Sequence, residues 1–279
     1  MKIPAFTFFL LTFSLTLSAQ YYYNDIVVTK ETNLQMKTFL INKVKSVTAT
    51  GYDNNGVKET NFAEVQEVKE NGNALRVSTT SNFNHTVLFN RFDSQKRLTS
   101  IIDSSADILS KTTYQYDSEG KITSIQNIVK DSTSDFNQTE IHNWFYSADG
   151  KPEKMWRIIN GTDSLEILLS TDEDGNIGYE RTYKKGVETG AIYYYHDEKK
   201  RLTDIVRYQS KLKRLIPDIM FEYDDYDRVI QKITTTSSLN MKYLIWRYIF
   251  NTKGLKTKEA LFNHKKEITG KIEYAYIFE

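Results

Sequence analysis

Acidic side chains gather at one stretch that could hold a metal ion. Residues 172–176 read Asp-Glu-Asp-Gly-Asn, which supplies the carboxylate and amide oxygens that Ca²⁺ prefers. A calcium loop of the EF-hand type needs glycine at its sixth place and glutamate at its twelfth, where this chain has Ile177 and Tyr183. A tight turn uses the same residue types. We therefore predict a turn here and no metal site.

The side chains most used in catalysis form no recognisable site. No two histidines have the spacing of metal ligands; they are His85, His142, His196 and His264. The chain has no cysteine, no Gly-x-Ser-x-Gly, no His-Glu-x-x-His and no glycine-rich phosphate loop. Carboxylate pairs that hydrolyse glycosides are defined by their distance in space, so the sequence cannot single one out. We predict no catalytic residue and no cofactor, and favour a protein without enzymatic activity.

Aromatic residues are the strongest candidates for ligand binding. Tryptophan and tyrosine side chains on strands would stack on sugars or peptides if they formed an exposed strip, although aromatic residues on strands more often pack in a core. The candidate ligand-binding residues are Trp144, Trp156, Tyr194 and Trp246, near Tyr193 and Tyr195. Their expected partner is an envelope protein or a glycan.

Composition and charge restrict the class of protein. The chain has 37 lysines and arginines against 36 aspartates and glutamates, which argues against a nucleic-acid partner bound through bulk charge. Its 19 tyrosines, 15 phenylalanines and only 3 prolines favour strands. Without cysteine, the chain forms no disulfides and carries no lipid on an N-terminal cysteine.

Residues 1–19 have the features of a secretory signal peptide. Lys2 precedes an apolar run over residues 3–17, and Ala19 before Gln20 is a plausible cleavage site. The run is short for a membrane span, so an uncleaved anchor is the alternative. No later segment is long and apolar enough to span a membrane as a helix. We expect an exported protein that is periplasmic, at the cell surface or secreted.

A turn motif recurs along the chain and predicts its architecture. In Tyr116-Asp-Ser-Glu-Gly120, aspartate at the first place and glycine at the left-handed fourth place predict a β-hairpin loop with a bulge, with Tyr116 opposite Ile122. Related turns begin at 93, 147, 172, 197, 224 and 251, in steps of 24 to 30 residues, and a weaker copy begins at 53. Each step holds two short strands and two connections. Lys96 and Lys200 replace the glycine, and there we expect a longer or differently shaped turn.

The elements give an all-β fold with one helix. A helix over residues 32–42, capped by Thr32, should cover an end or edge of the sheet. We predict an antiparallel β-hairpin repeat array in which residues 20–88 hold the helix and diverged capping hairpins and residues 89–279 hold the repeats. Ile122 and Ile125 are three apart, so either a bulge intervenes or both faces are covered. A curved open sheet, a barrel and a sandwich all remain possible.

The repeated turns resemble those of the Rhs and YD-repeat proteins. The likeness rests on Tyr-Asp-Ser-Glu-Gly-Lys-Ile at 116–122, Tyr-Asp-Asp-Tyr-Asp-Arg-Val at 223–229, and Asp-x-x-x-Arg-Leu-Thr-x-Ile from Asp93 and from Asp197. It covers about residues 89–256, with Thr171 and His196 in place of tyrosine. The resemblance implies a β-hairpin array and an exported or cell-surface life. It implies no catalytic residue, and the chain is far too short for the family's cargo-enclosing shell.

Three functional hypotheses follow. The first is an exported non-enzymatic repeat protein that acts as an envelope or surface scaffold or binding module. The second is a secreted hydrolase of polysaccharide or peptidoglycan. The third is a small outer-membrane β-barrel, which the charges on both faces of many segments disfavour.

Overall fold

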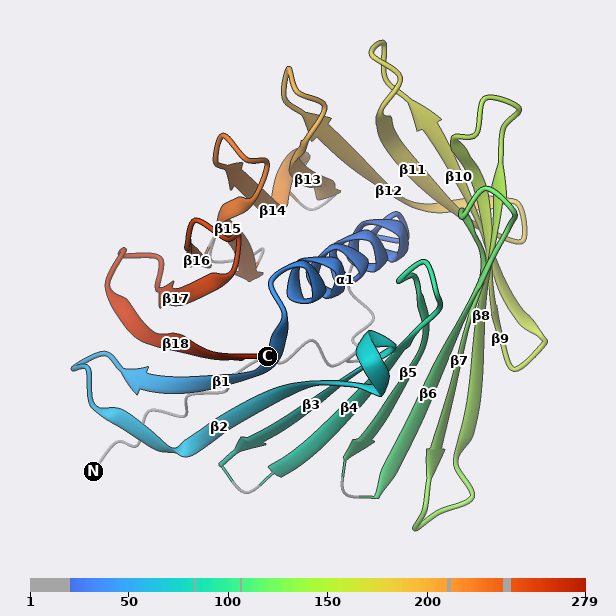
Figure 1. Ribbon diagram of the computed structural model, residues 1–279. Helices are drawn as coiled ribbons and strands as arrows, with labels where there is room; N and C mark the ends of the chain where they lie inside the picture. The colour runs from blue at the N-terminus through green and yellow to red at the C-terminus, as the bar shows by residue number, and fades with distance from the viewer. Residues whose placement is uncertain (1–20, 83, 106, 210–211, 238–241) are drawn as a thin grey trace.

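The computed structural model describes residues 21–82, 84–105, 107–209, 212–237 and 242–279. They form the helix α1 (Asn24–Ile41), a 3-10 turn (Glu70–Gly72) and one 18-stranded sheet (Figure 1). The strands are β1 Val44–Asp53, β2 Lys58–Lys69, β3 Ala74–Ser81, β4 Asn84–Phe92, β5 Leu98–Ser105, β6 Ile108–Tyr116, β7 Ile122–Asp131, β8 Asn137–Tyr146, β9 Pro152–Ile159, β10 Asp163–Thr171, β11 Ile177–Lys184, β12 Val187–His196, β13 Leu202–Gln209, β14 Arg214–Tyr223, β15 Val229–Ser237, β16 Lys242–Phe250, β17 Lys256–Phe262 and β18 Ile268–Phe278. The predicted signal peptide lies outside the described residues.

The sheet closes on itself as a barrel. Each strand pairs antiparallel with the next strand in sequence, as expected for a chain of hairpins. β1 also pairs with β18, with Val47 opposite Tyr276 and Asp53 opposite Gly270. The predicted all-β antiparallel meander with one N-terminal helix is confirmed, and of the three shapes left open the protein adopts the barrel.

The helix lies within the ring of strands (Figure 1) and contacts the end of the sheet where β4 turns into β5 and β16 into β17: Oδ1 of Asn33 accepts from the N–H of Leu98 at 2.8 Å, and Nδ2 of Asn42 donates to the carbonyl of Lys253 at 3.1 Å. It therefore covers one end of the sheet, as predicted. The predicted start is wrong, because α1 begins at Asn24 and Thr32 sits in its interior, where its hydroxyl donates to the carbonyl of Val28 at 2.9 Å. β-Branched Val27 and Val28 favour strands and hide the first turns.

Two apolar clusters pack around the two ends of α1. The Tyr22 cluster surrounds the N-terminal end and contains Tyr22, Ile122, Ile125, Trp144, Met155, Ile167, Leu169, Ile177, Ile192, Tyr194, Ile205 and Ile219. The Met36 cluster surrounds the C-terminal end and contains Met36, Phe39, Val44, Val47, Leu75, Phe92, Leu98 and Leu255. The hydrophobic core therefore fills part of the barrel interior, and α1 packs on it with one face while its other face stays exposed.

The repeated turns share one rim of the barrel. In an antiparallel meander, alternate connections lie at the same end of the sheet. The turns that begin at 93, 117, 147, 172, 197, 224 and 251 all join an even-numbered strand to the next odd-numbered one, so they lie together on what we call the turn rim. The weaker copy at Asp53 joins β1 to β2 and lies on the opposite rim.

Each aspartate of the motif fixes its own turn, and each tyrosine ties neighbouring hairpins together. Oδ1 of Asp117 accepts hydrogen bonds from the N–H groups of Glu119 and Lys121 at 2.9 and 2.8 Å. The hydroxyl of Tyr116 donates to the carbonyl of Leu98 at 2.6 Å, in the preceding hairpin. The same bond is made from Tyr146 to Ile122, from Tyr223 to Leu202 and from Tyr276 to Lys256.

The hairpin geometry confirms one prediction and corrects another. Tyr116 faces Ile122, and a register shift at this pair lets Ile122 and Ile125 both reach the core, so the bulge is the explanation for their spacing. Lys96 and Lys200 do not lengthen the turn: each adopts the left-handed conformation with φ of 62°. Their ammonium groups bond neighbouring carbonyls, at 3.0 Å to Gly72 and 3.1 Å to Asp174, which helps offset the backbone cost.

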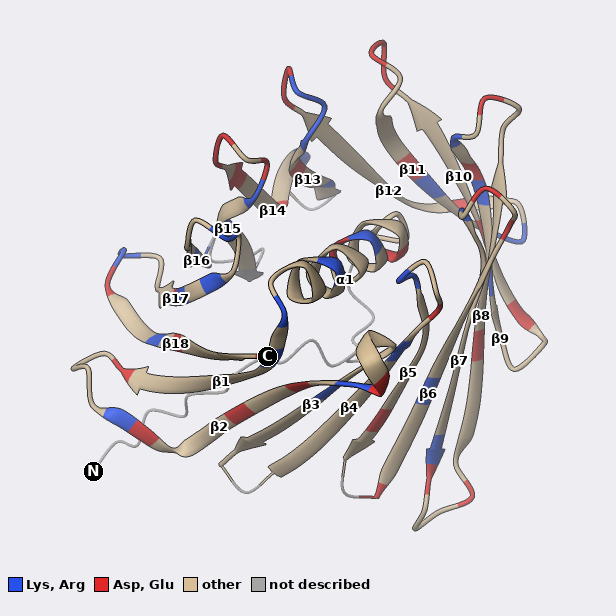
Figure 2. Cartoon of the chain, in the orientation of Figure 1, with Lys and Arg blue, Asp and Glu red and all other residues tan. Residues whose placement is uncertain are grey.

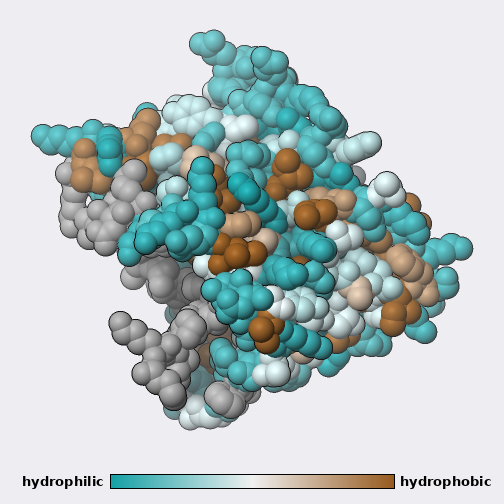
Figure 3. Space-filling model, turned by 90° about the vertical axis from the view of Figure 1, so that its left-hand side faces the viewer, coloured by the Kyte–Doolittle hydropathy of each residue, from teal (hydrophilic) through white to brown (hydrophobic). Residues whose placement is uncertain are grey.

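Charged residues are spread along many strands of the barrel (Figure 2). Ion pairs join neighbouring strands at 3.1, 3.8 and 3.3 Å; they are Glu67–Arg76, Lys154–Glu166 and Lys258–Glu273. The face at the left of Figure 1 shows hydrophobic side chains only as separate patches among hydrophilic ones (Figure 3). Across the described part of the chain, no helix is long and apolar enough to cross a membrane.

Candidate functional site

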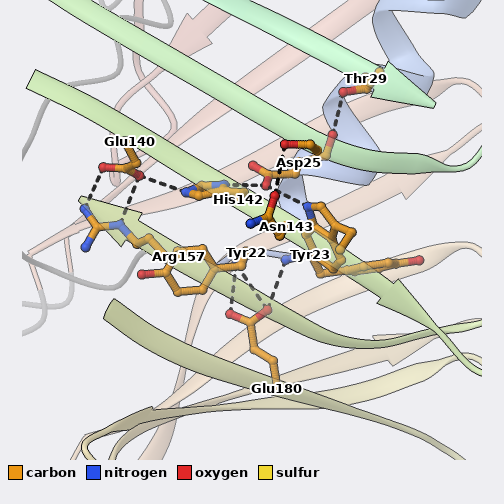
Figure 4. Close-up of polar contacts among 11 residues, drawn as sticks. Tyr22, Tyr23, Asp25, Thr29, Glu140, His142, Asn143, Arg157 and Glu180 are labelled. Carbon is orange, nitrogen blue, oxygen red and sulfur yellow. Dashed lines mark hydrogen bonds and ion pairs between the residues drawn. The ribbon is translucent and has the colours of Figure 1, made fainter. Parts of the chain in front are cut away.

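The start of α1 is held inside the barrel by a buried carboxylate. Glu180 on β11 is 1% exposed, and its carboxylate accepts hydrogen bonds from the backbone N–H of Tyr22 at 2.9 and 3.1 Å and of Tyr23 at 3.0 Å (Figure 4). The positive end of a helix dipole favours an anion at this place. Burial raises the pKa of Glu180 to about 7, although the two N–H groups oppose the shift.

A chain of four charged groups adjoins this carboxylate. Nδ1 of His142 lies 2.6 Å from Oδ2 of Asp25, and its Nε2 lies 2.8 Å from Oε1 of Glu140 (Figure 4). Arg157 donates two hydrogen bonds to Glu140, at 3.0 and 2.8 Å. Trp144 donates its indole N–H to Asp25 at 3.2 Å. The chain runs from the first turn of the helix across β8 to β9.

Protonation follows from this geometry. Burial by itself would lower the pKa of His142, but the charge of Asp25, with hydrogen bonds to Asp25 and Glu140, raises it to about 9. Burial would raise the pKa of Glu140, but the hydrogen bonds from His142 and Arg157 lower it to about 2. At neutral pH the imidazole is therefore a cation between two carboxylates.

This arrangement suits an anchor better than a catalyst. A general base needs a free nitrogen within reach of a substrate, whereas both ring nitrogens of His142 are bonded to carboxylates and the side chain is 5% exposed. The nearby hydroxyl of Thr29 donates to the carbonyl of Asp25 at 2.6 Å within the helix. The network thus fixes the first turn of α1 to the barrel wall.

A pocket opens at the opposite rim, where β2 departs from regular pairing. Thr50 faces Ala63 and Tyr52 faces Lys58, so Gly51 of β1 stands opposite four residues of β2, at 59–62. Such bulges often lie at barrel rims and re-aim side chains. The pocket holds about 500 Å³, counting the part open to solvent, and is lined by Gly51, Tyr52, Glu59, Asn61, Phe62, Ser81, Asn82, Trp246, Glu259, Leu261, Gly270, Lys271 and Ile272.

The four aromatic candidates from the sequence do not form one strip. Trp144 and Tyr194 are each 3% exposed and belong to the Tyr22 cluster, because their strand faces turn inward. Trp156 alternates with inward-facing Met155 and Arg157 and stands beside Lys154, whose ammonium lies 5.9 Å from its ring centroid. Trp246 lines the pocket. A role in ligand binding stays a prediction for all four, and the pocket makes Trp246 the best placed.

The acidic stretch at 172–176 forms the tight turn between β10 and β11. Oδ1 of Asp172 accepts from the N–H of Asn176 at 2.8 Å, and Gly175 has φ of 79°. Its aspartate acts as in the other copies of the motif. Among the residues that the structure describes, no three or more His, Cys, Asp or Glu side chains are arranged so that they could hold a metal ion.

Sequence reasoning missed the buried charges. Glu180 stands between Tyr179 and Arg181, in a pattern that gives no sign of an inward carboxylate. On β8, the positions of Glu140, His142 and Trp144 alternate with Ile141 and Phe145, and hydrophobic patterning would turn the latter inward. Glu140, His142 and Trp144 occupy alternate positions and therefore share one face of β8, and this spacing was the one feature of the sequence that could have placed them together.

Comparison with known proteins finds only distant similarities. No family model matches the chain, and no curated protein matches it in sequence. A chain of the Photorhabdus luminescens Tc holotoxin pore aligns with 12% identity and a TM-score of 0.35; the alignment covers 78% of this chain and only 12% of that one. A porin-like protein from Bacteroides uniformis aligns with 9% identity and a TM-score of 0.39, covering 84% and 98%. These similarities are too low to carry an argument about function.

Proposed function

We propose that the protein is an exported, non-enzymatic module that binds or scaffolds components of the cell envelope. The observation that carries the proposal is the closed barrel whose interior holds its own N-terminal helix, tied to the wall by Glu180 and by the Asp25–His142 pair. In this buried network Glu180, His142 and Glu140 are all bonded to other groups of the protein, which leaves them unsuited to act on a substrate. The outer wall and the pocket at the opposite rim are the surfaces left for contact with other molecules.

Export is part of the proposal and rests on the leader at residues 1–19. The likeness to Rhs and YD-repeat proteins is also proposed, and the turn rim supports it. There the Tyr-Asp pair has a physical role, since aspartate shapes the turn and tyrosine bonds the preceding hairpin. That role requires a repeating array of hairpins and no enzymatic activity.

Two rivals fit the molecule less well. A hydrolase needs two carboxylates that face one accessible substrate. Glu140 and Glu180 are buried and bonded to the protein itself, and of the two carboxylates that line the pocket, Glu59 and Glu259, the second is already paired with Lys256 at 2.6 Å. A membrane barrel needs an uncharged outer band, whereas Lys154, Glu166 and Lys258 form ion pairs along the outer wall. A wall of this kind fits contact with water.

Cell fractionation with N-terminal sequencing tests the proposal directly. The chain should be recovered outside the cytoplasm with Gln20 as its first residue, and residues 20–279 should cosediment with an isolated envelope preparation. The same material should release no reducing sugar from polysaccharide or peptidoglycan. A cytoplasmic, unprocessed chain or a sustained hydrolytic activity would refute the proposal.

A further inference from the structure

We propose that the pocket beside Trp246 binds one neutral sugar unit of a glycan. This inference rests on the proposed binding function and gives it a site and a ligand class. The pocket lies at the opposite rim, outside the network that anchors the helix, and none of the contacts described above at the turn rim uses it.

The chain builds this pocket through its backbone. The four-residue excursion of β2 at 59–62 stands over a single residue of β1. That residue is Gly51, and a Cβ there would lie 2.9 Å from Cδ1 of Phe62, so glycine lets the phenyl ring close one side of the pocket. Gly270 also lines the pocket without a side chain.

The lining combines the two kinds of surface that a sugar presents. A sugar ring has an apolar C–H face and a rim of hydroxyls that both donate and accept hydrogen bonds. The apolar part of the pocket comes from Phe62, Trp246, Leu261 and Ile272. Asn61 and Asn82 supply amides that also donate and accept, and Glu259 supplies a carboxylate. Sites with an apolar wall and a few placed polar groups orient such ligands.

Charge in the pocket favours a neutral ligand. Glu259 is 8% exposed, and its Oε2 already pairs with the ammonium of Lys256 at 2.6 Å. A cationic ligand would meet a carboxylate that is balanced. An anionic ligand would meet Glu59 and would find the ammonium of Lys271, which also lines the pocket, already paired with Glu273 at 2.9 Å. A carboxylate offers about four lone-pair sites, so Glu259 can still accept from a hydroxyl.

Saturation-transfer NMR with glucose, galactose, N-acetylglucosamine and the β-1,4 disaccharides of glucose and N-acetylglucosamine tests the site. At least one sugar should bind. Asn61→Trp blocks the mouth at an exposed position, and Glu259→Gln removes the carboxylate. Each substitution should raise the dissociation constant of the sugar at least tenfold, which corresponds to a loss of about 1.4 kcal/mol in binding free energy. Matched controls are Asn137→Trp, at another exposed asparagine of the same rim, and Glu119→Gln at the turn rim; both should bind as the unmodified protein does.

The outcomes separate the site from the function. If no sugar binds, or if Asn61→Trp binds as well as Asn137→Trp, the pocket assignment is wrong. Should Glu259→Gln fail to fold, Asn61→Trp decides alone. If the protein still cosediments with envelope material while the pocket assignment fails, the binding function stands on another surface. If cosedimentation fails as well, both proposals fall.

Discussion

The two ends of α1 are held inside the same barrel by different chemistry. The N-terminal end lies among buried charges, namely Glu180, the Asp25–His142 pair and the Glu140–Arg157 pair. The C-terminal end packs apolar Met36 and Phe39 into their cluster and adds neutral hydrogen bonds, such as the one from the N–H of Leu98 to Oδ1 of Asn33 at 2.8 Å. Apolar packing tolerates changes in pH, whereas buried ion pairs do not. The two ends should therefore respond differently to mutation and to pH.

Removing one charge at the N-terminal end should have the largest effect. Glu140→Ala leaves the cations of His142 and Arg157 buried without their shared partner, and breaking such a pair costs about 3–5 kcal/mol. Urea unfolding monitored by circular dichroism measures the loss. Glu119→Ala at an exposed turn is the control and should change stability by less than about 0.5 kcal/mol. A loss below about 1 kcal/mol for Glu140→Ala would mean that the network adds little.

Creating a cavity at the C-terminal end should cost somewhat less. Met36 is fully buried, so Met36→Ala should lower the free energy of unfolding by about 2–5 kcal/mol. Leu34→Ala provides the control on the same helix, because Leu34 is 62% exposed, and should be nearly neutral. Equal losses for the two variants would contradict the inward placement of Met36.

Of the two ends of α1, the N-terminal end should make stability depend on pH between about 4.5 and 9. Glu180 has a folded-state pKa raised to about 7, so the unfolded chain ionises first and stability falls as pH rises from about 4.5 to 7. His142 has a folded-state pKa raised to about 9, so its contribution is complete below about pH 6.5 and is lost as pH rises through 9. Each effect is on the order of 3 kcal/mol.

Urea midpoints measured across this range check both signs. Glu180→Gln should flatten the lower part of the profile, and His142→Gln the upper part. Met36→Ala should shift the whole profile without changing its shape. If the Met36→Ala variant lost the dependence of stability on pH, the assignment of that dependence to the N-terminal end of α1 would be wrong.

The smallest effect should be the same at both ends. Tyr146 packs against the Tyr22 cluster and Tyr276 against the Met36 cluster, and each hydroxyl donates to a carbonyl of the preceding hairpin, at 2.8 and 2.6 Å. Tyr146→Phe and Tyr276→Phe should each cost about 1 kcal/mol. Tyr195→Phe, at a 47% exposed ring, should cost almost nothing. Unequal costs for the first two, seen in thermal unfolding, would show that the turn rim is not uniform.

The sequence predicts what is local and misses what is long-range. The turn at Asp117, the pairing of Tyr116 with Ile122 and the bulge follow from neighbouring residues, and all three are present. Closure of β1 on β18 depends on twist accumulated over the whole sheet, which no single hairpin encodes. The early start of α1 is hidden because its first turns carry residues that favour strands when they stand alone.

The candidate site is less predictable than the fold. Trp246 was named from its residue type, but the pocket around it arises from the mismatch between Gly51 and residues 59–62, which only the pairing register reveals. The buried charges could not be predicted because Glu180 and Arg157 are residue types that usually face solvent on a strand. Alternate side chains of a strand point to opposite faces of the sheet. Which of these faces becomes the inside of the barrel is not specified by the sequence.

The pairing of the first strand with the last has a consequence for assembly. A ribosome releases β18, which holds the partner of Val47, only after the other seventeen strands of the sheet, so the ring stays unsealed until β18 has emerged. Until then both β1 and β17 present bare edges, which attract other chains. A product shortened by the eleven residues of β18 would keep those edges permanently and should self-associate rather than remain monomeric.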